Sequence, residues 1–203
     1  SDTCRVESKP GSGQLIDFPQ PLPLNKLTDV IAGWQSQLPG AHHSISFTGG
    51  EPLLNADSLS EWFPVIQKLL PIHLETNGTM NIALMRVIEY VDFISMDMKL
   101  PSTSGCTEQL WDLHRHFLVE ARKSDVSVKI VVGDSTDDAE VIKVCEIISS
   151  VDRSTPLFLQ PLTMPDGRIG VLPSRILRFQ ELASFRLPDV RVIPQMHKIL
   201  GVL

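Results

Sequence analysis

Segments with helical and strand-like sequence patterns alternate along this chain from about residue 25 onward. The helical segments repeat apolar residues at intervals of three and four, and the strand-like segments are short apolar runs rich in β-branched residues. The predicted helices are 25–37, 57–70, 82–90, 107–123, 137–150 and 173–185, and the predicted strands are 44–47, 72–75, 93–97, 126–132, 157–160 and 190–193. Because helical crossovers join parallel strands, this order predicts an α/β fold with a mainly parallel sheet.

Individual residues support these boundaries. Asn25 can cap the first predicted helix, and Pro173 suits the first turn of the last one. Pro64 is expected to bend or restart the second helix, because proline cannot donate the hydrogen bond that a helix interior needs.

The first 24 residues do not follow the alternating pattern. They contain four prolines and two glycines, which is typical of a loop, so we predict an irregular segment at 1–24 and a single β/α core over 25–203. A β/α chain ordinarily opens with a strand, and the sequence before Asn25 contains no credible one. We therefore expect a first strand to lie upstream of Ser1.

Length and charge restrict the class of protein. The 203 residues suit one domain, and 42% of them are apolar, as in ordinary globular proteins. The net charge of −6 argues against a nucleic-acid surface, which needs clustered Lys and Arg. No apolar run approaches the roughly 18 residues of a membrane span, and the polar start at 1–4 does not resemble a signal peptide. We expect a cytoplasmic protein with neither membrane nor nucleic acid as a partner.

Polar or glycine-rich clusters follow four of the predicted strands. They are Thr48-Gly49-Gly50-Glu51-Pro52, Glu75-Thr76-Asn77-Gly78-Thr79, Asp97-Met98-Lys99 and Gln160-Pro161-Leu162-Thr163. In parallel α/β sheets, ligands bind beside the carboxyl ends of the strands. Any one cluster could be a simple turn, but four clusters at corresponding positions favour one shared site.

The residue types indicate what such a site could hold. The Gly49-Gly50 pair would let a ligand approach the backbone, and Glu51 could bind a ligand ammonium. Lys99 could bind a carboxylate, or it could pair with Asp97. Gln160 could hydrogen-bond a ribose hydroxyl or a purine edge, or it could anchor a loop.

Residues 46–54 resemble the Gly-Gly-Glu-Pro element of the radical S-adenosylmethionine superfamily. Four further segments are similar, in the same order, to the 7-carboxy-7-deazaguanine synthase family within that superfamily. These segments are 74–79, 92–99, 158–161 and 195–198. The resemblance covers about residues 44–203.

This resemblance implies a partial β/α barrel of six strands and a radical S-adenosylmethionine lyase. Such an enzyme converts 6-carboxy-5,6,7,8-tetrahydropterin into 7-carboxy-7-deazaguanine with release of ammonia, on the route to queuosine-type bases. The implied cofactors are S-adenosylmethionine, Mg²⁺ and a 4Fe-4S cluster, which is held by three cysteines of a C-x3-C-x2-C motif. The small-molecule pterin is the implied substrate, and the other implied partners are an electron donor such as flavodoxin and a second copy in a homodimer.

The resemblance also implies roles for individual strand-end residues. S-adenosylmethionine would contact residues at its methionine end and at its adenosine end. The implied methionine-end residues are Gly49, Gly50, Glu51, Asp97, Met98 and Lys99, and the implied adenosine-end residues are Gln160, Pro161, Leu162 and Thr163. Within the first set, Gly49, Gly50 and Glu51 would meet the amino group, and Lys99 would hold the carboxylate.

Three further residues are implied for the substrate and the metal ion. Thr48 would reach the substrate. Thr3 is a candidate magnesium ligand, because Asp2-Thr3 resembles a pair that follows the last cluster cysteine in the family. Glu75, before Thr-Asn-Gly, is a second candidate, since related activating enzymes use an acidic residue there to hold a cation.

The chain departs from the family pattern at the iron–sulfur motif. Its cysteines, Cys4, Cys106 and Cys145, are far apart, and the sequence contains no C-x3-C-x2-C. We expect that motif to lie upstream of Ser1, and we expect this chain on its own to be inactive. Two alternatives stay open: a radical enzyme of the glycyl-radical-activating type, and a non-catalytic domain of the same fold without a cluster.

Overall fold

Six parallel strands form the central sheet, in a computed structural model that describes residues 3–105 and 110–195. They are β3 (Ile45–Phe47), β4 (Ile72–Thr76), β5 (Phe93–Asp97), β6 (Asp125–Val132), β7 (Leu157–Pro161) and β8 (Val190–Val192), and they neighbour one another in chain order. The register places Glu75 opposite Ser95, and Asp97 opposite Lys129. The predicted parallel sheet is confirmed, and all six carboxyl ends lie at one edge.

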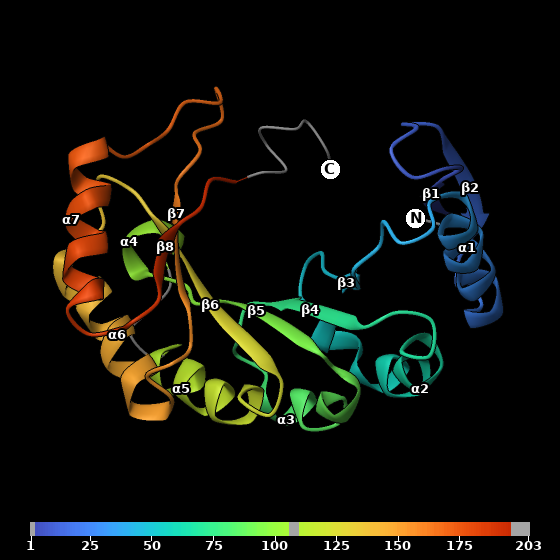
Figure 1. Ribbon diagram of the computed structural model, residues 1–203, viewed down its shortest axis with the longest axis horizontal. Helices are drawn as coiled ribbons and strands as arrows, with labels where there is room; N and C mark the ends of the chain where they lie inside the picture. The colour runs from blue at the N-terminus through green and yellow to red at the C-terminus, as the bar shows by residue number, and fades with distance from the viewer. Residues whose placement is uncertain (1–2, 106–109, 196–203) are drawn as a thin grey trace.

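Helices cover one face of this sheet. Figure 1 shows the sheet curving around an open concave face, with helices along the convex side. The helices on the convex side are α2 (Ala56–Ile66), α3 (Asn81–Leu84), α5 (Leu110–Ala121), α6 (Asp138–Val151) and α7 (Pro173–Ser184). Helix α1 (Leu24–Gln37) stands near the β3 end of the sheet. The arrangement is a partial β/α barrel, as the sequence resemblance implied.

Several helices differ from their predicted bounds. The helix expected at 82–90 consists of α3 and a separate 3₁₀ turn at Ile88–Tyr90. The helix expected at 107–123 is described from Leu110, and a short helix α4 (Pro101–Ser104) precedes it. Helix α2 runs through Pro64 and ends at Ile66, so the chain does not restart a helix there.

The N-terminal segment contains a β-hairpin, so the prediction of an irregular loop over 1–24 is wrong. Strand β1 (Thr3–Glu7) pairs antiparallel with β2 (Leu15–Pro19). The carboxylate of Glu7 closes the connecting loop, because it accepts hydrogen bonds from the amides of Gly11 at 2.8 Å and Gly13 at 2.9 Å. The prolines and glycines suggested a loop throughout, but they fall in the connecting loop and at the end of β2, and they leave two five-residue strands between them.

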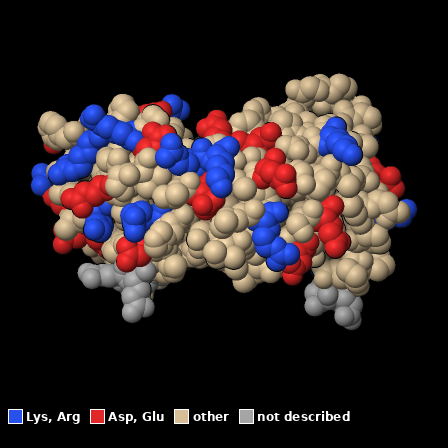
Figure 2. Space-filling model, turned by 90° about the horizontal axis from the view of Figure 1, so that it is seen from below, with Lys and Arg blue, Asp and Glu red and all other residues tan. Residues whose placement is uncertain are grey.

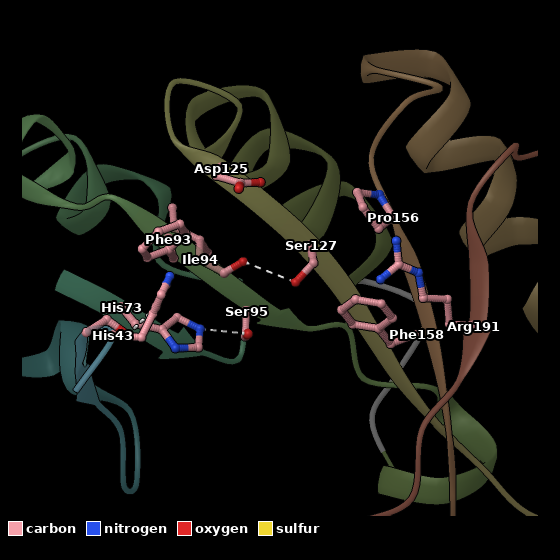
Figure 3. A pocket seen from close by; sticks show the side chains of 11 residues that line it. His43, His73, Phe93, Ile94, Ser95, Asp125, Ser127, Pro156, Phe158 and Arg191 are labelled. Atoms are coloured by element: carbon pink, nitrogen blue, oxygen red, sulfur yellow. Dashed lines mark hydrogen bonds between the residues drawn. The ribbon is translucent and has the colours of Figure 1, made fainter. Parts of the chain in front are cut away.

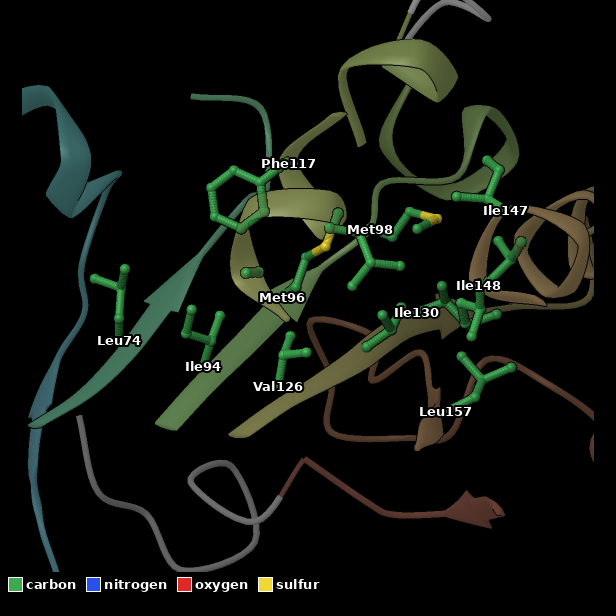
Figure 4. Packing of buried hydrophobic residues seen from close by; sticks show 14 of the residues in the cluster. Leu74, Ile94, Met96, Met98, Phe117, Val126, Ile130, Ile147, Ile148 and Leu157 are labelled. Atoms are coloured by element: carbon green, nitrogen blue, oxygen red, sulfur yellow. The ribbon is translucent and has the colours of Figure 1, made fainter. Parts of the chain in front are cut away.

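The hydrophobic core lies between the sheet and the convex-side helices. Successive residues of a strand point to opposite faces, so every second strand residue faces the helices. Figure 4 shows these side chains packed against residues of α5 and α6. The strand and helix residues of this core that are at most 1% exposed include Leu74, Ile94, Met96, Phe117, Ile130, Ile148 and Leu157.

The alternate strand residues face the concave side, and many of them are polar. They include Ser46, His73, Glu75, Ser95, Asp97, Ser127, Lys129, Gln160 and Arg191. A parallel sheet that is packed on both faces carries apolar residues on both. The concave face of this sheet is therefore suited to water or a polar ligand.

Charged side chains of both signs occupy the outer face. Figure 2 shows Lys and Arg among Asp and Glu on the helix-covered side. Arg178 of α7, for example, donates to Asp138 of α6 at 2.7 Å. Among the helices of 3–105 and 110–195, none has both the length and the apolar character that a bilayer crossing requires.

We expect Phe117→Ala to lower the free energy of unfolding by about 3–5 kcal/mol, because the ring is fully buried and its loss leaves a cavity. Phe185→Ala is the matched control, since that ring is 73% exposed and its removal should change stability by less than about 0.5 kcal/mol. Urea unfolding measures both values. Equal losses in the two variants would contradict the placement of the core.

Candidate functional site

The four predicted clusters lie along the carboxyl edge of the sheet. The loops after β3, β4, β5 and β7 begin at Thr48, Asn77, Met98 and Leu162. Parallel pairing places these starts along one edge, with β6 between β5 and β7. The topology therefore places the four clusters at one edge of the sheet, and the expectation that they form one shared site stays a prediction. Their side chains have different surroundings, however, and these decide what each residue can do.

Glu51 joins the loop after β3 to the end of β4. Its Oε1 accepts hydrogen bonds from the Leu53 amide at 3.1 Å and the Thr76 hydroxyl at 2.8 Å, and its Oε2 accepts one from the Asn77 amide at 2.8 Å. The residue is only 8% exposed. Glu51 thus fixes the two loops relative to each other, and the contact with a ligand ammonium stays a prediction.

Gly49 and Gly50 adopt backbone conformations that other residues rarely adopt. Their φ angles are +90° and +59°. A Cβ built on either residue would meet no heavy atom within 4 Å. Glycine is therefore favoured at both positions by the positive φ angle and not by steric crowding. The space beside the two residues is open to a ligand.

The turn after β4 is built by its own polar side chains. The Thr76 hydroxyl accepts from the Gly78 amide at 3.2 Å, and Asn77 Oδ1 accepts from the amide and hydroxyl of Thr79 at 3.1 and 2.6 Å. Gly78 has φ +66°, and a Cβ there would lie 2.6 Å from the side chain of Met96. The turn therefore has both a conformational and a steric need for glycine.

His114 of α5 connects the loops after β4 and β5 from the helix-covered side of the sheet. Its Nε2 accepts from the Lys99 amide at 3.2 Å, so Nδ1 is the protonated nitrogen that donates to the Gly78 carbonyl at 3.0 Å. Burial lowers the pKa of His114, which favours this neutral form. Sequence reasoning gave His114 no role, although it lies on the same face of its helix as Phe117 and Leu118.

Asp97 and Lys99 form an ion pair on the concave side of the edge. Lys99 Nζ lies 2.7 Å from Asp97 Oδ2, so the expected pairing of these residues is present. Lys129, on the next strand, places its Nζ 3.7 Å from the same oxygen. Within the described residues, Asp97 Oδ1 is buried without a hydrogen-bond partner. Sequence reasoning did not identify Lys129, whose position within a strand is its only signal.

One predicted site residue, Met98, directs its side chain away from the concave face. The side chain of Met98 is fully buried in the core (Figure 4), so only its backbone could line a ligand site. The side chain of Leu162 packs beside Gly133, where a Cβ would be 3.3 Å from Leu162 Cδ2. Gln160 lies on the concave side of β7, and Thr163 lines a pocket of about 380 Å³ that includes Gln195.

A pocket of about 480 Å³ adjoins the loop after β3. Thr48 and Gly49 line it, together with Gln20 from the segment after β2 and with Trp62 of α2. Cys4 of β1 also borders it. The predicted substrate residue Thr48 therefore faces a cavity that the N-terminal hairpin helps to form.

The candidate magnesium residues come from separate elements. Thr3 belongs to β1, and Glu75 belongs to β4. Among residues 3–105 and 110–195, no three His, Cys, Asp or Glu side chains are grouped so that they could hold a metal ion. Residues 196–198 of the resemblance and Cys106 lie outside the described parts of the chain.

A second part of the concave face lies toward the amino ends of the strands. Figure 3 shows His73, Ser95 and Ser127 along the floor of a pocket of about 400 Å³, with Phe158 and Arg191 at one side. His73 Nε2 is 2.8 Å from the Ser95 hydroxyl, and burial lowers the pKa of His73. Ser127 precedes Lys129 by two residues, so this polar floor continues to the Asp97 ion pair.

Proteins named 7-carboxy-7-deazaguanine synthase are similar to this chain in sequence. A 7-carboxy-7-deazaguanine synthase of Geobacter sulfurreducens is 47% identical over 203 residues, which cover 100% of this chain and 81% of that protein. A protein of the same name from Methanothermobacter thermautotrophicus is 30% identical over 211 residues, which cover 95% of this chain and 80% of that protein. No protein-family model matches the chain.

A solved structure shares the fold. A radical SAM methyltransferase from Sphaerobacter thermophilus superposes with a TM-score of 0.62, covering 85% of this chain and 58% of that chain. The two sequences are 16% identical, so the likeness concerns the fold alone.

We expect the stability of the protein to fall as the pH drops below 6.5, the ordinary pKa of histidine, in part because of His114. Its pKa is lowered in the folded state, so the unfolded chain binds more protons there and the contribution of His114 is lost on acidification. His114→Gln should therefore reduce the difference in unfolding free energy between about pH 7.5 and about pH 5.5. Urea unfolding at the two pH values measures this difference.

His116→Gln is the matched control, because that side chain is exposed on the same helix. It should leave the pH dependence unchanged. If both variants kept the full pH dependence, the buried neutral state of His114 would be refuted.

Proposed function

The chain belongs to the family of 7-carboxy-7-deazaguanine synthases, and we propose that it binds S-adenosylmethionine on the concave side of its sheet and serves the conversion of 6-carboxy-5,6,7,8-tetrahydropterin into 7-carboxy-7-deazaguanine. The observation that supports the proposal is the arrangement of residues at the carboxyl edge. There, an open glycine loop held by Glu51 lies at the same edge as the Asp97–Lys99 ion pair. The 47% identity to a named synthase supports the choice of reaction.

The residues at this edge fit S-adenosylmethionine. The empty space beside Gly49 and Gly50 admits a ligand close to the backbone. The buried Oδ1 of Asp97 has no donor among the described residues and can accept one from a ligand hydroxyl. The Lys99 side chain is 37% exposed, and its ammonium retains donors for a carboxylate. When bound, S-adenosylmethionine supplies the deoxyadenosyl group for hydrogen abstraction from the substrate.

The pterin would occupy the cavity beside Thr48. That cavity of about 480 Å³ is large enough for a two-ring compound and adjoins the glycine loop, so the substrate and the adenosyl group would be neighbours. The Thr48 hydroxyl would orient the substrate by hydrogen bonding. The hairpin residues on the other wall would limit access of water to it.

The described residues do not fit an iron–sulfur cluster. Cys4 lies in β1, whereas Cys145 is buried in α6, where burial raises the pKa of its thiol to about 11. A 4Fe-4S cluster needs several neighbouring thiolates, and these two cysteines do not supply them. For magnesium, Glu75 joins no group of three His, Cys, Asp or Glu side chains that could hold a metal ion within the described residues, and Thr3 lies on a separate element.

Other features implied by the resemblance stay predictions. They are an electron donor such as flavodoxin, a homodimer and a cytoplasmic location. The organisation of the chain as one domain is likewise part of the proposal, and the shared sheet of β3–β8 supports it.

We expect the chain to bind S-adenosylhomocysteine, a stable analogue of the cofactor, in isothermal titration calorimetry. Gly50→Val should weaken that binding at least about tenfold, because a branched side chain would enter the open space and the residue would resist its positive φ. Gly40→Val is the matched control, since Gly40 has φ +75° but lies outside the four strand-end clusters. Absence of binding by the unaltered chain would refute the cofactor proposal.

We also propose that this chain alone assembles no stable 4Fe-4S cluster and forms no 7-carboxy-7-deazaguanine. Its sequence contains Cys4, Cys106 and Cys145 at wide separations and lacks the C-x3-C-x2-C motif that the resemblance implies for the cluster ligands. Anaerobic incubation with iron and sulfide, followed by absorption spectroscopy and product analysis, tests this. A brown protein that turns over the tetrahydropterin would contradict it.

A further inference from the structure

Two lysines approach the same carboxylate at the carboxyl edge. Lys99 Nζ is 2.7 Å from Asp97 Oδ2, and Lys129 Nζ is 3.7 Å from that oxygen. Only the first distance is that of a hydrogen bond. The side chains are partly shielded, with exposed fractions of 37% for Lys99, 25% for Lys129 and 21% for Asp97.

The strands fix this arrangement. Asp97 and Lys129 are directly opposite each other on β5 and β6, so the backbone ladder holds Lys129 beside the carboxylate. Lys99 follows the end of β5 and its side chain is the more exposed of the two lysines. Lys99 is thus the lysine that can reorient toward a ligand, whereas the strand holds Lys129 beside Asp97.

We propose that Lys129 is a positioning residue that neutralises Asp97 when Lys99 binds the carboxylate of the S-adenosylmethionine methionine group. The inference rests on the proposed function. In the free protein, one ammonium suffices for one carboxylate. A bound ligand brings a second carboxylate to the same partly buried place, and two like charges repel unless a second cation is present. Lys129 is that second cation and needs only a small side-chain movement to reach Asp97.

This role predicts a selective effect on ligands. Without Lys129, Asp97 and the ligand carboxylate would share Lys99, so ligands that carry a carboxylate should bind less well. A ligand that has the adenosine part but no amino-acid part should be unaffected. S-adenosylhomocysteine and 5′-methylthioadenosine form such a pair.

Isothermal titration calorimetry of the full chain with both compounds tests the proposal. Lys129→Met should weaken S-adenosylhomocysteine binding about tenfold or more, as expected for a lost charged interaction. It should change 5′-methylthioadenosine binding by less than about twofold, which also shows that the variant is folded. Lys129→Arg should restore most of the affinity for S-adenosylhomocysteine, because it restores the positive charge.

Two further measurements make the outcomes decisive. Lys123→Met removes an exposed lysine from an ion pair with Glu120 on α5 and should affect neither compound. In an Asp97→Asn background, Lys129→Met should lose its selective effect, because no carboxylate remains to be neutralised. Equal weakening of both compounds by Lys129→Met, or no weakening of either, overturns the inference while the proposed function stands. Failure of the unaltered chain to bind S-adenosylhomocysteine overturns the proposed function itself.

Discussion

The buried carboxylate of Glu51 is the interaction on which the geometry of the carboxyl edge depends. It accepts hydrogen bonds from its own loop, from the last residue of β4 and from the first residue after β4, so the glycine loop is tied to the neighbouring strand. A carboxylate taken out of water is costly unless it is fully hydrogen-bonded, and here three donors meet that need. His114 does the same for the next pair of loops, because it bonds Gly78 after β4 and Lys99 after β5. The loops after β3, β4 and β5 are therefore linked in series by two buried polar side chains, Glu51 and His114.

One face of the sheet contributes to the hydrophobic core, and the other face is suited to ligand binding. Residues facing the helices are apolar and almost fully buried, whereas the alternate residues carry hydroxyl, imidazole, carboxylate and ammonium groups. The same strand therefore supplies core and site at every second residue. On β5, Met96 packs against the helices while Asp97 beside it meets two lysines. A shift of one residue in register would exchange the two faces, so the site and the core require the same pairing.

Much of this fold could be predicted from the sequence, because strand and helix patterns alternate clearly and parallel strands place their ends together. The glycine loop at Gly49-Gly50 and the Asp97–Lys99 pair were identified in this way. The loop-linking hydrogen bonds of Glu51 and His114 could not be predicted, since the partners on other elements lie 15 to 36 residues away in sequence and only the folded chain brings them together. The N-terminal hairpin was missed because its strands are short and bounded by proline and glycine. Lys129 was missed because a lysine inside a strand has no local signal that it faces a site.

The hydrogen bonding of His114 limits what this histidine can do chemically. One ring nitrogen is occupied by a backbone amide and the other by a backbone carbonyl, so neither is available to coordinate a metal ion or to exchange a proton with a substrate. Turning the ring toward the concave side would leave both backbone groups buried and unsatisfied. Although it is an imidazole close to the proposed cofactor, His114 is confined to the role of a neutral spacer, and acid–base chemistry at this edge must come from other side chains.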